Sequence, residues 1–115
     1  NTSSDYRLKE NIVAISDGIT RLKTLKPSRF NWIGDTNSTR DGFIAHEVTA
    51  VPEAITGTKD EVYTEDQPNI NVKAGDPKYQ GIDQSRLVPL ITAALQEAVS
   101  KIEVLETKVA ALEAA

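Results

Sequence analysis

The sequence has no cysteine and only one histidine among its 115 residues. Without cysteine, disulfides and thiolate metal sites are excluded, and a single histidine cannot complete the usual zinc ligand sets within one chain. No apolar run approaches the ~18 to 20 residues that a membrane span needs. We therefore expect a protein that uses no metal, no cofactor and no membrane.

Aromatic residues are also scarce, and the 17 acidic residues outnumber the 13 basic ones. Aromatic residues make up 5% of the chain and hydrophobic residues 39%, which predicts one domain with a modest core that gains from oligomerisation. The net charge is −4 and the pI is near 5.0. With no basic stripe among interleaved aromatics, the composition argues against nucleic acid as a partner.

The first half of the chain alternates short helical and extended signals, which is typical of an α+β body. Residues 16–27 predict a short helix that Pro27 ends, with its apolar side chains on one face. Residues 28–33 predict a strand, in which Phe30 and Trp32 are expected to be core residues first and exposed groove residues second. Residues 34–42 read as a polar loop.

The next segment carries apolar residues at helical spacing and predicts a helix or helical turn over residues 43–55, stopped near Pro52. Residues 56–80 are rich in Gly, Pro, Asp and Lys. Within and just after them, the runs "NINV" and "YQGI" are candidates for short antiparallel strands. This stretch is a candidate arm that contacts a neighbouring protomer or an upstream stalk, and the sequence leaves the choice open.

The strongest periodic signal is one long helix from Asp83 onward, capped by Asp83 or Ser85, with Pro89 tolerated only in its first turns. Its apolar residues are spaced alternately by three and four positions, an unbroken a/d heptad register. The register consists of Val88, Ile91, Leu95, Ala98, Ile102, Leu105, Val109 and Leu112. Hereafter these eight residues are called the heptad seam.

A strict heptad repeat predicts a partner helix, whereas a helix packed on its own domain drifts towards a period of 3.6 residues. In a parallel coiled coil, the g-position Lys101 would face Glu106 of the neighbouring chain, and Lys108 would face Glu113. Such pairs favour the parallel orientation. The alternative is a surface helix of the monomer, and the heptads alone do not decide between dimer and trimer.

The first residues hold a serine and a lysine five positions apart, Ser4 and Lys9. A serine hydroxyl becomes nucleophilic when a neutral lysine takes its proton, and burial or a nearby cation favours the neutral amine. Arg7 supplies such a positive charge and Asp5 opposes it. A Ser-x4-Lys spacing by itself is a weak signal, because terminal serines and lysines are usually solvated.

Three blocks of the sequence form recognisable motifs. The opening S-D-x-R-x-K consists of Ser4, Asp5, Arg7 and Lys9. The block G-F-I-A-x-E consists of Gly42, Phe43, Ile44, Ala45 and Glu47, with His46 in the variable place. The block S-R-L-x-P-L consists of Ser85, Arg86, Leu87, Pro89 and Leu90. Together these blocks resemble the C-terminal intramolecular chaperone domain of bacteriophage tailspikes and tail fibres, the S74 peptidase family.

The resemblance implies a homotrimer that aligns the upstream fibre of the same polypeptide and then releases itself by autoproteolysis, in the host bacterial cytoplasm during virion assembly. It implies Ser4 as nucleophile, Lys9 as general base and Ser3–Ser4 as the scissile bond. Asp5, Arg7, His46 and Glu47 are candidate supporting residues, with the catalytic share of His46 and Glu47 the minor interpretation.

The predicted organisation is a residual fibre end over residues 1–3, a chaperone and peptidase body over 4–82, and a trimerisation helix over 83–115. Ser3 is the rival nucleophile, but it breaks the spacing to Lys9. An alternative of a different class is a non-enzymatic oligomerisation or adaptor domain with the same fold and no self-cleavage.

Overall fold

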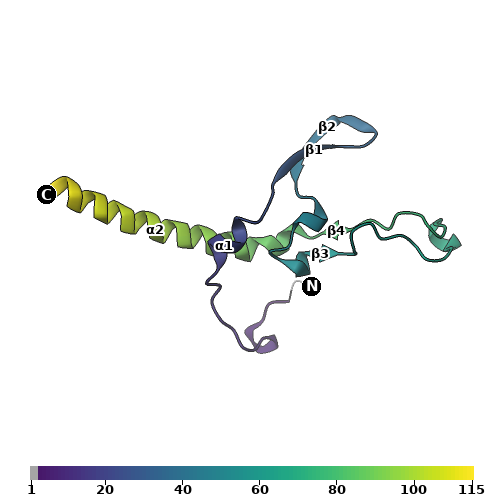
Figure 1. Ribbon diagram of the computed structural model, residues 1–115. Coiled ribbons are helices and arrows are strands. Elements are labelled where there is room, and N and C mark those ends of the chain that lie inside the picture. Colours follow the sequence, from purple (N-terminus) through teal and green to yellow (C-terminus); the bar gives the residue numbers. More distant parts are fainter. Residues whose placement is uncertain (1–2) are drawn as a thin grey trace.

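The computed structural model describes residues 3–115 and shows an extended α+β molecule. Its radius of gyration is 20.8 Å, whereas a compact domain of this length would have roughly 13 Å. A long C-terminal helix leaves a small central body, from which a hairpin, a long loop and the N-terminal segment project in different directions (Figure 1). The predicted class, a small body of helices and antiparallel strands followed by a long helix, is confirmed.

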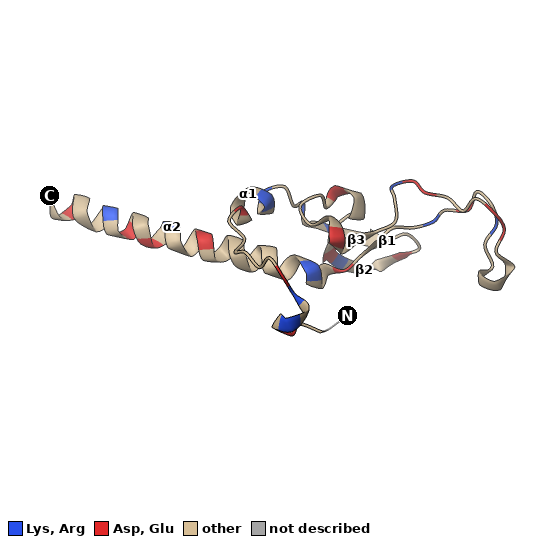
Figure 2. Ribbon diagram, turned by 90° about the horizontal axis from the view of Figure 1, so that it is seen from below, with Lys and Arg blue, Asp and Glu red and all other residues tan. Residues whose placement is uncertain are grey.

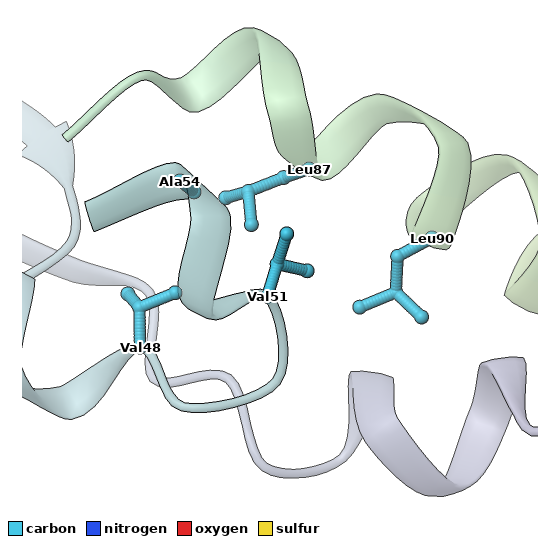
Figure 3. Packing of buried hydrophobic residues seen from close by; sticks show 5 residues of the cluster. All are labelled: Val48, Val51, Ala54, Leu87 and Leu90. Carbon is cyan, nitrogen blue, oxygen red and sulfur yellow. The ribbon is translucent and has the colours of Figure 1, made fainter.

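The body is held by one small apolar core. Val48, Val51 and Ala54 come from two short 3-10 turns, Ala45–Glu47 and Pro52–Ala54, and the segments around them. They pack against Leu87 and Leu90, at the start of the long helix (Figure 3). The predicted helix or helical turn over 43–55 is therefore two turns, and Pro52 begins the second one because its missing amide costs nothing at a first helical position.

The long helix α2 spans Val88–Ala114 and follows directly on a 3-10 turn, Gln84–Leu87. Asp83 caps that turn, since its carboxylate accepts a hydrogen bond from the Ser85 amide at 3.1 Å. Pro89 lies in the first turn of α2, as predicted. No helix within residues 3–115 is both long enough and apolar enough to cross a membrane.

A short helix α1, Gly18–Leu22, lies across the first half of α2 (Figure 1). It is shorter than the predicted segment 16–27, and Asp17 occupies the cap position without a side-chain cap bond. Gly18 permits the close crossing, because a Cβ at that position would lie 2.7 Å from the Ala94 nitrogen. Arg21 ties α1 to the core turns by donating to the Ala50 carbonyl at 2.6 and 3.1 Å.

The predicted polar loop 34–42 is wrong, because this segment is a strand. Strand β1, Ser28–Trp32, pairs antiparallel with β2, Asp35–Gly42, through a tight turn where Gly34 adopts φ +89°. Polar residues suffice for β2 because the hairpin projects into solvent and is held by its ladder and by the Arg29–Asp41 ion pair at 2.8 Å. For Trp32 the core expectation is also wrong: it is 59% exposed and contacts Phe30 edge to face.

The stretch 57–80 forms a long irregular excursion that leaves and re-enters the body through a two-residue ladder. Strand β3, Ile55–Thr56, pairs antiparallel with β4, Gly81–Ile82. The predicted strand in "YQGI" is thus confirmed for its last two residues. The run "NINV" instead contributes to a 3-10 turn, Pro68–Ile70, and to a single bridge between Gln67 and Val72.

Candidate functional site

The structure brings Ser4 and Lys9 together. Between them lies a single 3-10 turn, Tyr6–Leu8, and the Lys9 ammonium donates a hydrogen bond to the Ser4 hydroxyl with 2.7 Å between Nζ and Oγ. The backbone folds this way because Leu8 and Lys9 donate their amides to the carbonyls of Asp5 and Tyr6, at 3.0 and 3.2 Å. The geometry is that of a nucleophile and a base within proton-transfer distance.

Asp5 and Arg7 form a close ion pair inside the same turn. The Arg7 guanidinium donates from Nε and from a terminal nitrogen to the two carboxylate oxygens of Asp5, both at 2.9 Å. The side-chain hydrogen bond from Arg7, and then that from its amide, lower the pKa of Asp5, while the same contact raises the pKa of Arg7 above its usual value. Both groups are therefore charged at neutral pH.

The segment that carries these residues, here called the N-terminal arm (residues 3–17), does not pack on the body. All its side chains are exposed, although several are large and apolar. Tyr6, Leu8, Ile12 and Val13 are 71–84% exposed. Figure 2 shows charged positions of the first ten residues gathered close to the N-terminus. In a single chain the dyad is thus in full contact with water.

His46 and Glu47 lie elsewhere, on the 3-10 turn Ala45–Glu47. His46 lines a surface hollow with Lys59, Asp60 and Gln80, on the body side of the 57–80 excursion. Over the described part of the chain, no hydrogen bond or ion pair joins either residue to Ser4 or Lys9. The single chain therefore does not bring these two candidate supporting residues into the dyad.

The heptad seam is not used by the chain's own body. Seven of its side chains are 42–76% exposed, and Ala98 is half-buried. The residues of α2 that do contact the body lie on a neighbouring stripe, rotated by roughly 100° about the helix axis at 100° per residue. This body-facing stripe consists of Leu90, Ala94 and Glu97, and it continues the line of the buried Leu87.

The charges beside the seam have only local partners in one chain. Lys101 pairs with Glu97 on the preceding turn, with 3.6 Å between Nζ and Oε1. For Glu106, Lys108 and Glu113 there is no ion pair within residues 3–115. The predicted ion pairs of Lys101 with Glu106 and of Lys108 with Glu113 would need a second chain, and they stay a prediction.

Sequence reasoning missed the link between α1 and α2. Glu97 accepts a hydrogen bond from the Ile19 amide at 3.1 Å, so it satisfies a backbone donor in the first turn of α1. The same carboxylate forms the ion pair with Lys101. The only signal in the sequence for this role of Glu97 was its position on the same helix face as Leu90 and Ala94.

Among the side chains of residues 3–115, no group of three or more His, Asp and Glu is placed to hold a metal ion.

Residues 4–56 match the Peptidase S74 family, described as the chaperone of endosialidase. No curated protein matches the chain. The match confirms the resemblance drawn from the sequence over this segment, which includes the Ser4–Lys9 turn and the G-F-I-A-x-E block. The heptad seam lies outside the matched residues.

Proposed function

We propose that this chain, whose residues 4–56 belong to the Peptidase S74 family of endosialidase chaperones, is a self-releasing intramolecular chaperone of a phage tail fibre or tailspike. In this proposal three copies associate through the heptad seam, align the upstream fibre of the same polypeptide, and then cut the Ser3–Ser4 bond. The site of action is the bacterial cytoplasm during virion assembly. The observation that carries the proteolytic part is the 2.7 Å contact between Lys9 Nζ and Ser4 Oγ.

The chemistry follows from the position of the nucleophile directly after the scissile bond. Neutral Lys9 accepts the Ser4 hydroxyl proton while Oγ attacks the Ser3 carbonyl carbon. The tetrahedral intermediate collapses by expelling the Ser4 nitrogen, which takes the proton back from Lys9, and an ester joins Ser3 to Ser4 Oγ. Water then hydrolyses the ester, so that the upstream chain ends in the Ser3 carboxylate and the released chaperone begins with Ser4.

Exposure of the dyad supports a role for assembly in this reaction. A lysine acts as a base only as a neutral amine, and burial favours that form over the ammonium. In one chain Ser4 and Lys9 are exposed, and so are the apolar side chains of the N-terminal arm around them. We therefore propose that the trimer covers the arm, removes water from the dyad and so makes cleavage follow assembly.

Two structural features support the chaperone part. The heptad seam is unoccupied by the chain's own body, and the core of buried side chains is small for a chain of 115 residues. Aligning three long chains before a stalk can pair is costly in entropy, and a parallel coiled coil at one end lowers that cost by raising the local concentration of chains. Removal of the aligner after folding leaves a product whose persistence is kinetic.

The test is a longer chain that includes fibre residues upstream of Asn1, compared on a denaturing gel with its Ser4→Ala and Lys9→Ala variants. We expect cleavage between Ser3 and Ser4 in the wild type only, verified by the N-terminal sequence of the released fragment. If all three proteins remain whole while still trimerising, the non-enzymatic adaptor is the correct function. Cleavage in Ser4→Ala would assign the nucleophile to another residue, with Ser3 first in line.

A further inference from the structure

The turn between Ser4 and Lys9 is held by polar contacts, namely hydrogen bonds and the Asp5–Arg7 ion pair. Two residues five positions apart lie up to roughly 18 Å from one another in an extended chain, so the turn itself brings the two functional groups together. None of the residues Tyr6–Leu8 is buried, and apolar packing therefore does not stabilise the turn in the single chain. Whatever fixes the ends of the turn also fixes the distance between the hydroxyl and the amine.

Asp5 accepts hydrogen bonds from both the backbone amide and the side chain of Arg7. Its Oδ1 accepts a hydrogen bond from the Arg7 amide at 2.9 Å, which is the cap of the 3-10 helix. The same carboxylate receives the Arg7 guanidinium through Nε and a terminal nitrogen, each at 2.9 Å. An aspartate in this position satisfies an amide that would otherwise lack a partner within the turn.

The ion pair also changes how Arg7 is understood. From the sequence, Arg7 was expected to act as a cation that favours the neutral form of Lys9. In the structure its charge is compensated by a carboxylate in fork geometry, and the guanidinium side chain is 75% exposed. The neighbourhood of Lys9 therefore contains a paired aspartate and arginine rather than an isolated positive charge.

We propose that Asp5 is a positioning residue for the Ser4/Lys9 reaction, acting by capping the Tyr6–Leu8 turn and clamping Arg7 across it. This inference rests on the proposed self-cleavage. Asp5 does not touch the reacting atoms: it holds the turn whose two ends carry the nucleophile and the base. The acidic residue of the S-D-x-R-x-K block is thereby given a geometric role.

The experiment compares three variants of the longer chain that carries upstream fibre residues. Asp5→Asn keeps an oxygen that accepts from the Arg7 amide but removes the charge, whereas Asp5→Ala removes both. Glu10→Ala is the matched control. The substitution also removes one negative charge beside Lys9, but Glu10 has no hydrogen bond or ion pair within residues 3–115. Cleavage rates are measured from pH 6 to pH 10, together with the oligomeric state.

We expect Asp5→Ala to slow cleavage by at least about tenfold at every pH, since small displacements of a catalytic pair cost up to about 100-fold. Asp5→Asn should stay within a few-fold of the wild type at high pH. The rise of its cleavage rate with pH should occur at lower pH than in the wild type, because Arg7 is left as an unpaired cation in the same turn as Lys9. Glu10→Ala should cleave like the wild type, and all variants should remain trimers.

Two results would overturn the positioning role. One is equal slowing by Asp5→Asn and Asp5→Ala, which would make the charge of Asp5 the relevant property rather than its cap. The other is a wild-type rate in Asp5→Ala. A wild type that itself stays uncleaved, with Ser4→Ala and Lys9→Ala indistinguishable from it, instead refutes the proposed self-cleavage, and the positioning role fails with it.

Discussion

The two halves of α2 share one heptad register but have different surroundings. Up to Glu97 the helix lies against α1 and the core turns, and Leu90 and Ala94 are 1–2% exposed. From Val99 to Ala115 every residue is exposed, and the helix extends alone beyond the body (Figure 1). The intrachain fold thus uses one stripe of the first half, and the heptad seam runs unchanged through both halves on a neighbouring stripe. This unused repeat is the surface through which we propose that copies of the chain associate.

The largest expected effect is on assembly, from an aspartate placed in the free half of the seam. Leu105→Asp puts one carboxylate per chain into a single layer of the coiled coil, where unpaired burial costs several kcal/mol per group. We expect trimerisation to weaken by more than about 100-fold, which corresponds to about 2.7 kcal/mol. Sedimentation velocity over a concentration series measures the effect, and cleavage of the longer chain should be lost in parallel.

The neighbouring residue supplies the control for this change. Val104 and Leu105 are 53% and 58% exposed in the single chain, but only Leu105 lies on the heptad seam. Val104→Asp should therefore leave assembly close to that of the wild type. If both variants dissociate equally, or if Leu105→Asp stays trimeric, the seam is not the interface. Full processing of a monomeric Leu105→Asp chain would separate cleavage from assembly.

A core substitution in the packed half tests the other side of the comparison. Leu90→Ala removes a side chain that is 2% exposed, which should lower the free energy of unfolding by about 2–5 kcal/mol per chain. Leu95→Ala, five residues on and 63% exposed, removes the same atoms from the seam. In the Leu105→Asp background, which removes assembly, we expect thermal unfolding to respond to Leu90→Ala and hardly to Leu95→Ala. Equal shifts would mean that the monomer does use the seam.

The smallest expected effect concerns pH and the start of the packed half. The hydrogen bond from the Ser85 hydroxyl, with a smaller contribution from the Ser85 amide, holds the pKa of Asp83 below its usual value. A lowered pKa in the folded state stabilises the fold above the ordinary value near 4, and this stabilisation is lost as pH falls through the folded value. Asp83→Asn should therefore show a slightly shallower loss of stability below about pH 4. An identical slope in both proteins would contradict this contribution.

Sequence reasoning worked best where a pattern is local or repeats over many turns. The long helix and the strand over 28–32 were read from neighbouring residues, because helical periodicity and strand alternation depend on positions close in sequence. The predicted aspartate cap was wrong for the long helix itself, since Asp83 caps the preceding 3-10 turn and α2 begins at Val88 without a side-chain cap. The polar strand 35–42 was missed because its stability comes from pairing with another segment rather than from its own pattern.

The amino-acid sequence by itself determined which stripe of α2 repeats every seven residues and which residues follow Ser4 along the chain, since both follow from covalent order and helical geometry. Only the tertiary structure decided that the body occupies a different stripe, with Gly18 against Ala94 and Glu97 at the Ile19 amide. It also separated His46 from the dyad and paired Arg7 with Asp5. These outcomes depend on how segments distant in sequence, or flexible side chains, settle against one another, and no local pattern encodes that geometry.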